Sequence, residues 1–192
     1  EYSIATGSEK LTDVRLEKTV AYPDGSPAFY FARLRYVDNI DEIFAAERAV
    51  RAVLQEGTVN INGQEVGIRF SYLDAVSQSD TIRLIFDDDE YTYIKTLEDN
   101  PFIIELTYPL PVTVNGFSLI IGSANIRVMI TASGAPGAEP VTYTFEGKGS
   151  ENEPELSFDL PQPVNAQVLH IEVLDPFSPP PAQIHIWELT LR

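Results

Sequence analysis

Hydrophobic and polar residues alternate along most of the chain, as they do in strands that bury one face. In the first 78 residues the alternation is imperfect over 11–20 and clear over 28–37, and the segment between them, 22–27, consists of turn-forming residues. The segment 40–55 differs, because its apolar residues form one stripe at helical spacing behind a capping box of Asn39 and Glu42. An Asn62-Gly63 pair then separates two further strands, and such a pair favours a hairpin turn. We therefore predict that residues 1–78 form a smaller β-rich region with one helix over 40–55.

After residue 79 the helical spacing disappears, and short apolar runs are separated by clusters of Gly, Pro and Asn. Many short strands at this spacing favour an antiparallel sandwich over a parallel sheet. The pattern is weakest over 75–80, so we place a domain boundary there and predict a second domain over 79–192. The strands predicted in it are 81–86, 91–96, 102–108, 112–121, 125–132, 139–146, 155–159, 166–174 and 182–191.

The composition is that of a globular protein, with 44% hydrophobic and 22% charged residues. A formal net charge of −16 repels phosphate backbones and anionic lipid surfaces, so neither nucleic acid nor a membrane is an expected partner. Cations and neutral polar ligands remain. The chain has no cysteine, which excludes disulfides and thiolate metal sites. It begins without Met or a signal-peptide pattern, so we expect it to be part of a larger polypeptide.

The most unusual segment is a run of acids, Asp87-Asp88-Asp89-Glu90, which we call the acidic corner. It follows the apolar run 81–86 directly and is followed by the aromatic, β-prone residues 91–93. Several carboxylates on one short loop repel one another, and either solvent or a hard cation relieves that repulsion. The residues alone leave both possibilities open.

Three segments of the second domain resemble the discoidin, or coagulation factor 5/8 type C, family. Residues 86–92 (FDDDEYT) are similar to the family's Phe-Asp-Gly-Asp/Asn-x-x-Thr loop, 101–106 and 112–119 to the strand pair after it, and 184–191 (IHIWELTL) to its last strand. The resemblance implies a mainly β fold, the antiparallel jelly-roll sandwich of galactose-binding-like domains. Two positions depart from the family: Asp88 replaces a Gly, so the loop must tolerate a side chain, and Ile94 replaces a Trp.

The resemblance also implies a structural Ca²⁺, with Na⁺ as the alternative, bound between the acidic corner and the last strand. The implied ligands are the side chains of Asp87, Asp89, Thr92 and Glu188 and the main-chain oxygens of Leu84 and Trp187. Six to eight oxygens of this kind suit Ca²⁺.

Catalysis finds little support in the sequence. There is no Gly-x-Ser-x-Gly elbow, His-Glu-x-x-His motif, phosphate-binding loop or dinucleotide glycine pattern. The two histidines, His170 and His185, lie in β-prone runs, and the alternation places His185 on the face opposite Ile184 and Ile186. A surface or inter-strand position therefore suits His185 better than the role of a general base.

Sugars present apolar ring faces together with hydroxyls, so a sugar site needs exposed aromatic side chains beside polar groups. The candidate ligand-binding residues are Phe177, in a Pro-rich turn, and then Tyr91 and Tyr93. Each has a structural alternative, because Phe177 could close the end of the sandwich and Tyr93 could face the core. We assign Trp187, the only tryptophan, to the core because it lies in the last strand.

Together these features predict a non-catalytic binding module, a carbohydrate-binding accessory domain of an extracytoplasmic (secreted or cell-envelope) bacterial protein. The alternative is a structural or protein-interaction module of a larger envelope protein.

Overall fold

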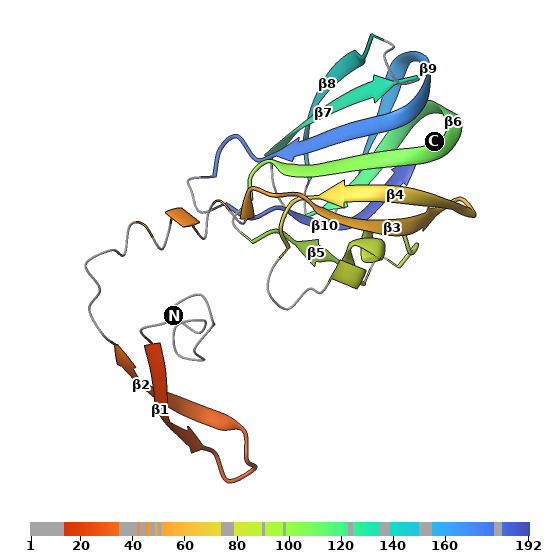
Figure 1. Cartoon of the computed structure of the whole chain (residues 1–192). Coiled ribbons are helices and arrows are strands. Elements are labelled where there is room, and N and C mark those ends of the chain that lie inside the picture. Colours follow the sequence, from red (N-terminus) through yellow and green to blue (C-terminus); the bar gives the residue numbers. More distant parts are fainter. Residues whose placement is uncertain are drawn as a thin grey trace. The chain divides into compact units, whose positions relative to one another are not determined.

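The computed structural model describes residues 14–34, 51–73, 79–89, 91–97, 99–122, 125–134, 139–149, 155–178 and 182–192, together with residues 42, 45, 46 and 49 (Figure 1). The chain divides into two compact units, Glu1–Ala52 and Val53–Arg192. The boundary predicted at 78/79 therefore falls inside the second unit, which also contains the predicted hairpin of residues 58–72. Within the described residues, no helix is long and apolar enough to cross a membrane.

The first unit contains a two-stranded antiparallel hairpin of β1 (Val14–Ala21) and β2 (Pro27–Leu34). Its turn is the predicted one: the Gly25 amide donates to the Tyr22 carbonyl, and the Asp24 carboxylate accepts from both the amide and the hydroxyl of Ser26. Of the predicted helix, residues 42, 45, 46, 49 and 51 are helical and most others lie outside the described residues. A strand begins at Gln55, so the helix ends earlier than the sequence suggested.

The second unit is an antiparallel β-sandwich, as predicted. Its elements are β3 (Gln55–Ile61), β4 (Gln64–Phe70), the 3₁₀ helix η1 (Ser79–Ile85), β5 (Ile94–Lys95), β6 (Phe102–Ile121), β7 (Asn125–Ser133), β8 (Val141–Lys148), β9 (Glu155–Leu174) and β10 (His185–Leu191). The strand order is β3-β4-β6-β9-β7-β8, and β10 pairs with both β6 and β5. Because β4 is bonded to β6, the hairpin that was assigned to the N-terminal region is part of this sheet.

Two 20-residue strands, β6 and β9, each contribute to both layers of the sandwich. Their pairing is interrupted where β6 reads 108–111 (YPLP) and again where β9 reads 160–163 (LPQP). Proline cannot donate to a β-ladder, so it is found at bulges and edges, and bulges bend a strand. One half of β6 pairs with β4 and the other with β10, and both long strands curl at one end of the sandwich (Figure 1). The sequence pattern had predicted two strands in place of each: 102–108 and 112–121 for β6, and 155–159 and 166–174 for β9.

Alternating residues of both layers fill the core. Phe70, Phe102 and Phe117 are fully buried, and so are the isoleucines and leucines that pack around them. Ile94, which stands where the family has Trp, is 2% exposed and is also part of this core. The smaller side chain is therefore accommodated.

The segment 81–86, predicted as a strand, is instead the 3₁₀ helix η1. Ile82 and Ile85 are both buried, and in a 3₁₀ helix residues three apart lie on the same face. The apolar run is too short to distinguish the two periods. The predicted strand 91–96 is reduced to the two residues of β5, which pair with the start of β10.

Candidate functional site

The acidic corner begins one residue after the end of η1 and is organised by its own hydrogen bonds. The Asp89 amide donates to the Asp87 carboxylate (3.1 Å), and the Tyr91 amide donates to the Asp89 carboxylate (3.0 Å). The hydroxyl oxygen of Thr92 lies 3.0 Å from the carbonyl oxygen of Asp89, 3.2 Å from both carboxylate oxygens of Asp87 and 3.4 Å from the carbonyl oxygen of Leu84. Three of the six predicted cation ligands therefore converge at this loop: the Asp87 carboxylate, the Thr92 hydroxyl and the Leu84 carbonyl. Asp89 presents its main-chain carbonyl to Thr92, while its carboxylate, the predicted ligand, accepts from the Tyr91 amide. Asp88 has a φ of 59°, which explains why the family has Gly at this position.

Glu188 lies beside the acidic corner, as the sequence predicted. Its side chain comes from β10 and is 7% exposed, and it accepts hydrogen bonds from the amides of Asp88 and Leu189. One carboxylate oxygen, Oε2, is buried without a hydrogen-bond partner. Burial and then the negative charges of Asp88 and Asp87 raise the pKa of Glu188 to about 7.

These residues fit a cation site that draws on several kinds of oxygen. Within the described residues, no three acidic or histidine side chains form a cluster that could hold a metal by themselves. A cation here would therefore depend on the carbonyl of Leu84 and the hydroxyl of Thr92 in addition to the carboxylates. Trp187, whose main-chain oxygen was the sixth expected ligand, directly precedes Glu188 in β10. The unpartnered oxygen of Glu188 supports the fit, because a buried carboxylate oxygen needs a counter-charge or a donor.

A cluster of three rings lies on the outward face of β10 and the segment before β5. Tyr93, the most exposed of the three at 49%, has its ring centroid 5.2 Å from that of Trp187 and 6.1 Å from that of His185. The His185 and Trp187 centroids are 6.4 Å apart. We call Tyr93, His185 and Trp187 the ring cluster. Its position corrects the assignment of Trp187 to the core, and it also excludes a core position for Tyr93.

His185 is electrically neutral at pH 7. Partial burial, and then the positive charge of Lys95 on the neighbouring β5, lower the pKa of His185 below its usual 6.5. Ile184 and Ile186 are buried while His185 is only half-buried, so the predicted outward position of His185 is confirmed.

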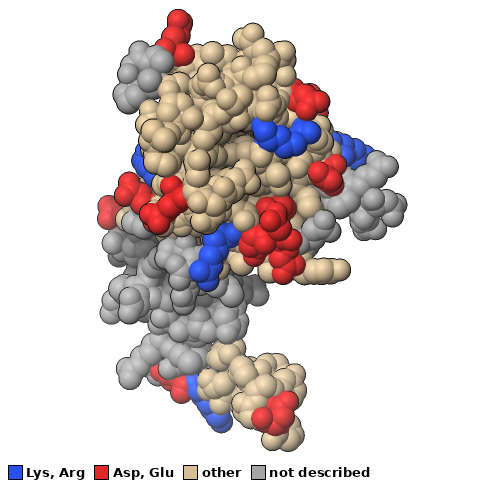
Figure 2. Space-filling view, turned by 90° about the vertical axis from the view of Figure 1, so that its right-hand side faces the viewer, with Lys and Arg blue, Asp and Glu red and all other residues tan. Residues whose placement is uncertain are grey.

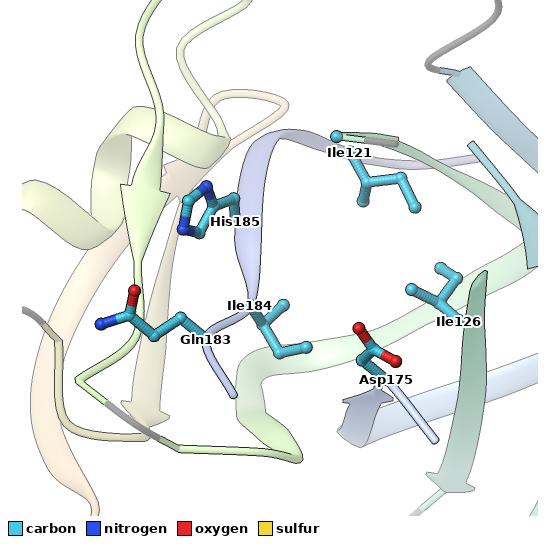
Figure 3. Close-up of a pocket in the computed structure, with 7 residues that line it drawn as sticks. Ile121, Ile126, Asp175, Gln183, Ile184 and His185 are labelled. Carbon is cyan, nitrogen blue, oxygen red and sulfur yellow. The ribbon is translucent and has the colours of Figure 1, made fainter. Parts of the chain in front are cut away.

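A pocket of about 250 Å³ adjoins the ring cluster. Ile121, Ile126 and Ile184 give it apolar walls, and the Asp175 carboxylate points toward the space between them (Figure 3). His185 belongs both to the pocket lining and to the ring cluster. The remaining lining residues are Gly122 and Gln183.

Asp175 is held in place by the turn that follows β9. Its carboxylate accepts from the amides of Phe177 and Ser178 and from the hydroxyl of Ser178 (2.6 Å). Burial alone would raise the pKa of Asp175, but these hydrogen bonds outweigh it and lower the pKa below 3.8, so Asp175 is anionic. Phe177 itself is 75% exposed, so it does not close the end of the sandwich.

The three predicted ligand-binding aromatics are therefore all at the surface, in different settings. Tyr93 belongs to the ring cluster, Phe177 is in the turn that Asp175 caps, and Tyr91, 94% exposed, extends from the acidic corner.

On the face shown in Figure 2, acidic side chains gather in separate groups and leave a broad uncharged area between them. Sequence reasoning missed Asp175 and the ring of Trp187, of which it named only the main-chain oxygen, as an implied cation ligand. The alternation of 184–187 contained a signal for Trp187, because it places Trp187 on the same face as His185.

His170 lies in a row of charged groups on the outer face of the sheet. Its Nδ1 is 3.2 Å from the Glu105 carboxylate and its Nε2 is 2.8 Å from that of Glu172. Glu105 also accepts from Arg69 at 2.7 Å. The ring of His170 thus contacts Glu105 on the neighbouring strand β6 and Glu172 on its own strand, β9.

No protein-family model and no curated protein matches this sequence. Among solved structures, a family 32 carbohydrate-binding module of Clostridium perfringens NanJ, in complex with galactose, aligns with a TM-score of 0.51 and 13% identity over 71% of this chain and 98% of that one. A pectin-binding carbohydrate-binding module aligns with a TM-score of 0.51 and 13% identity, over 65% and 88%.

A Ruminococcus gnavus GH29 fucosidase, in complex with fucose, aligns with a TM-score of 0.54 and 10% identity over 79% of this chain, which spans only 29% of the fucosidase chain. Identities this low establish the fold alone. The expected resemblance is confirmed at that level: the second unit has the discoidin, or galactose-binding-like, β-sandwich fold found in family 32 carbohydrate-binding modules.

Proposed function

We propose that this chain is a non-catalytic carbohydrate-binding module, an accessory part of a larger extracytoplasmic protein. The observation that carries this proposal is the ring cluster beside a pocket whose walls are apolar and whose one charged group is a fixed carboxylate. Ring faces stack against the apolar faces of sugars, and a carboxylate accepts hydrogen bonds from sugar hydroxyls. Two of the similar structures are carbohydrate-binding modules, and in the fucosidase the matching region is part of a longer chain.

Neutral sugars suit this site better than acidic ones. The carboxylate of Asp175 lies in the pocket wall, His185 is neutral, and the chain as a whole carries a formal charge of −16. A uronic acid would bring a second negative charge into a partly desolvated pocket, where like charges repel strongly.

Intrinsic fluorescence tests this proposal directly, because Trp187 is the only tryptophan. A glycan array would first be screened for neutral sugars that bind, and their titration should then change the emission of Trp187 saturably. Tyr93→Ala should weaken binding, whereas Tyr22→Ala, which removes an exposed tyrosine of the turn between β1 and β2, should leave it within about twofold. Tyr91→Ala tests the predicted aromatic beside the acidic corner. Phe177→Ala tests the remaining predicted aromatic in the same way.

Absence of binding to every glycan would overturn the proposal. Binding to partner proteins without any sugar response would instead favour the alternative, a structural or protein-interaction module.

We also propose that a structural Ca²⁺, or Na⁺ in its place, binds between the acidic corner and Glu188. Asp87, Asp89, Thr92 and the Leu84 carbonyl would hold it together with Glu188, and its positive charge would offset the repulsion among these carboxylates. Bound there, it would connect η1 and the following loop to the last strand. Chelation should lower the melting temperature and added Ca²⁺ should restore it. Indifference to both treatments would contradict the site.

A further inference from the structure

The pocket and the ring cluster are parts of one continuous surface. His185 lines the pocket and its ring centroid is 6.1 Å from that of Tyr93. Gly122, another lining residue, lies under Trp187: a Cβ added at Gly122 would be 3.6 Å from the six-membered ring of Trp187. The pocket therefore opens beside the rings.

The two parts differ in what they can hold. A pocket of about 250 Å³ is smaller than the roughly 300–1,000 Å³ typical of sites for drug-sized ligands, so it suits one small unit. The Asp175 carboxylate has room for about four hydrogen bonds and accepts three from its own turn, which leaves acceptor capacity for a sugar hydroxyl. The ring cluster is not enclosed. Tyr93, half exposed, presents a ring to any unit that extends out of the pocket.

We infer that the site binds neutral oligosaccharides of at least two units, with the terminal sugar in the pocket and the second sugar stacked on Tyr93. This inference rests on the proposed carbohydrate-binding function. We therefore expect the affinity for the sugar to increase from monosaccharide to disaccharide, and we expect Tyr93 to supply the increase. One aromatic contact of this kind corresponds to about 2- to 10-fold in affinity.

The experiment compares matched sugars on the intact chain by calorimetry. The probes are galactose, fucose, glucose and mannose, each alone and as the terminal unit of a neutral disaccharide and trisaccharide. The wild-type chain should bind at least one disaccharide about 2- to 10-fold more tightly than its terminal monosaccharide, with little further gain for the trisaccharide.

Two variants separate the two parts of the site. Tyr93→Ala should abolish the gain from the second unit and leave monosaccharide affinity within about twofold. Asp175→Asn, which suits the same turn, should weaken monosaccharide and disaccharide alike. Tyr22→Ala, which removes an exposed tyrosine of the turn between β1 and β2, is the matched control and should change neither affinity. Circular dichroism of each variant would confirm that the sandwich is folded.

The failures are distinguishable. If no sugar in any series binds, the proposed function is wrong and this inference is wrong with it. If monosaccharides bind as tightly as their disaccharides, or if Tyr93→Ala lowers both affinities equally, carbohydrate binding stands and the two-unit arrangement is overturned.

Discussion

Glu188 should make the metal-free protein less stable as the pH rises. The side chain is 7% exposed, lies beside Asp87 and Asp88, and has a pKa raised from 4.5 to about 7. In the folded protein it therefore retains its proton at pH values where the unfolded chain has lost it. Since the folded state binds the extra proton, stability decreases as the pH rises through the window from about 4.5 to 7. Glu188→Gln keeps the shape of the side chain and removes its charge.

The size of the effect follows from the pKa. A rise from 4.5 to about 7 corresponds, at about 1.4 kcal/mol for each tenfold change in the protonation equilibrium, to about 3 kcal/mol at most. In chelator at pH 8, Glu188→Gln should therefore be more stable than the wild type by up to about 3 kcal/mol, and most of this difference should be gone at pH 5. For a chain of this length that corresponds to roughly 6–12 °C in melting temperature.

Urea unfolding of both proteins at pH 5, 6, 7 and 8 in chelator measures this difference. Comparing the two proteins at each pH cancels the effects of the other carboxylates, and Glu155→Gln, which neutralises an exposed glutamate of β9, controls for the change in net charge. With Ca²⁺ added, the order should reverse at pH 8, because a bound cation favours the ionised carboxylate and Glu188→Gln removes a ligand. A stability difference that does not change with pH would refute the reasoning.

Three further predictions concern the backbone, a buried hydroxyl and a histidine. Asp88→Gly should stabilise the chain by about 1 kcal/mol in urea unfolding, because the backbone φ of Asp88 is 59°. Gly63→Ala, at a φ of 80°, should destabilise the chain by a similar amount. A change of stability in the same direction for both variants would contradict this explanation. Thr96→Val should cost about 1–3 kcal/mol, because the Ile184 amide donates to the buried Thr96 hydroxyl (2.9 Å) and would lose its acceptor. The His185 imidazole should titrate below pH 6.5 by NMR. Its contribution to the stability of the fold should be lost as the pH falls below 6.5, since the unfolded chain then binds the proton more readily. A titration midpoint at or above 6.5 would be inconsistent with the burial of His185 beside Lys95.

The sequence determined the features that depend on local pattern and on segment order. Alternation predicted most of the strands, and the Asn62-Gly63 pair predicted the hairpin turn. The segments that resemble the discoidin family predicted both the sandwich and the proximity of the acidic corner to Glu188. Replacement of Gly by Asp88 likewise indicated a loop position that must tolerate a side chain, and the positive φ agrees.

Only the tertiary structure decided which residues the second half of β10 buries. The alternation holds from Ile184 to Glu188 and then breaks, because a register shift between Ile186 and Glu188 leaves Trp187 without a partner on β6, and Glu188 and Leu189 are both buried. A bulge depends on the partner strand, here β6, and a period of two along one strand contains no information about it. The union of β6 and β9 across their prolines and the 3₁₀ form of 79–85 were hidden for the same reason, because contacts distant in sequence select among conformations that the local pattern permits. The ring cluster, the pocket and the raised pKa of Glu188 all depend on such contacts.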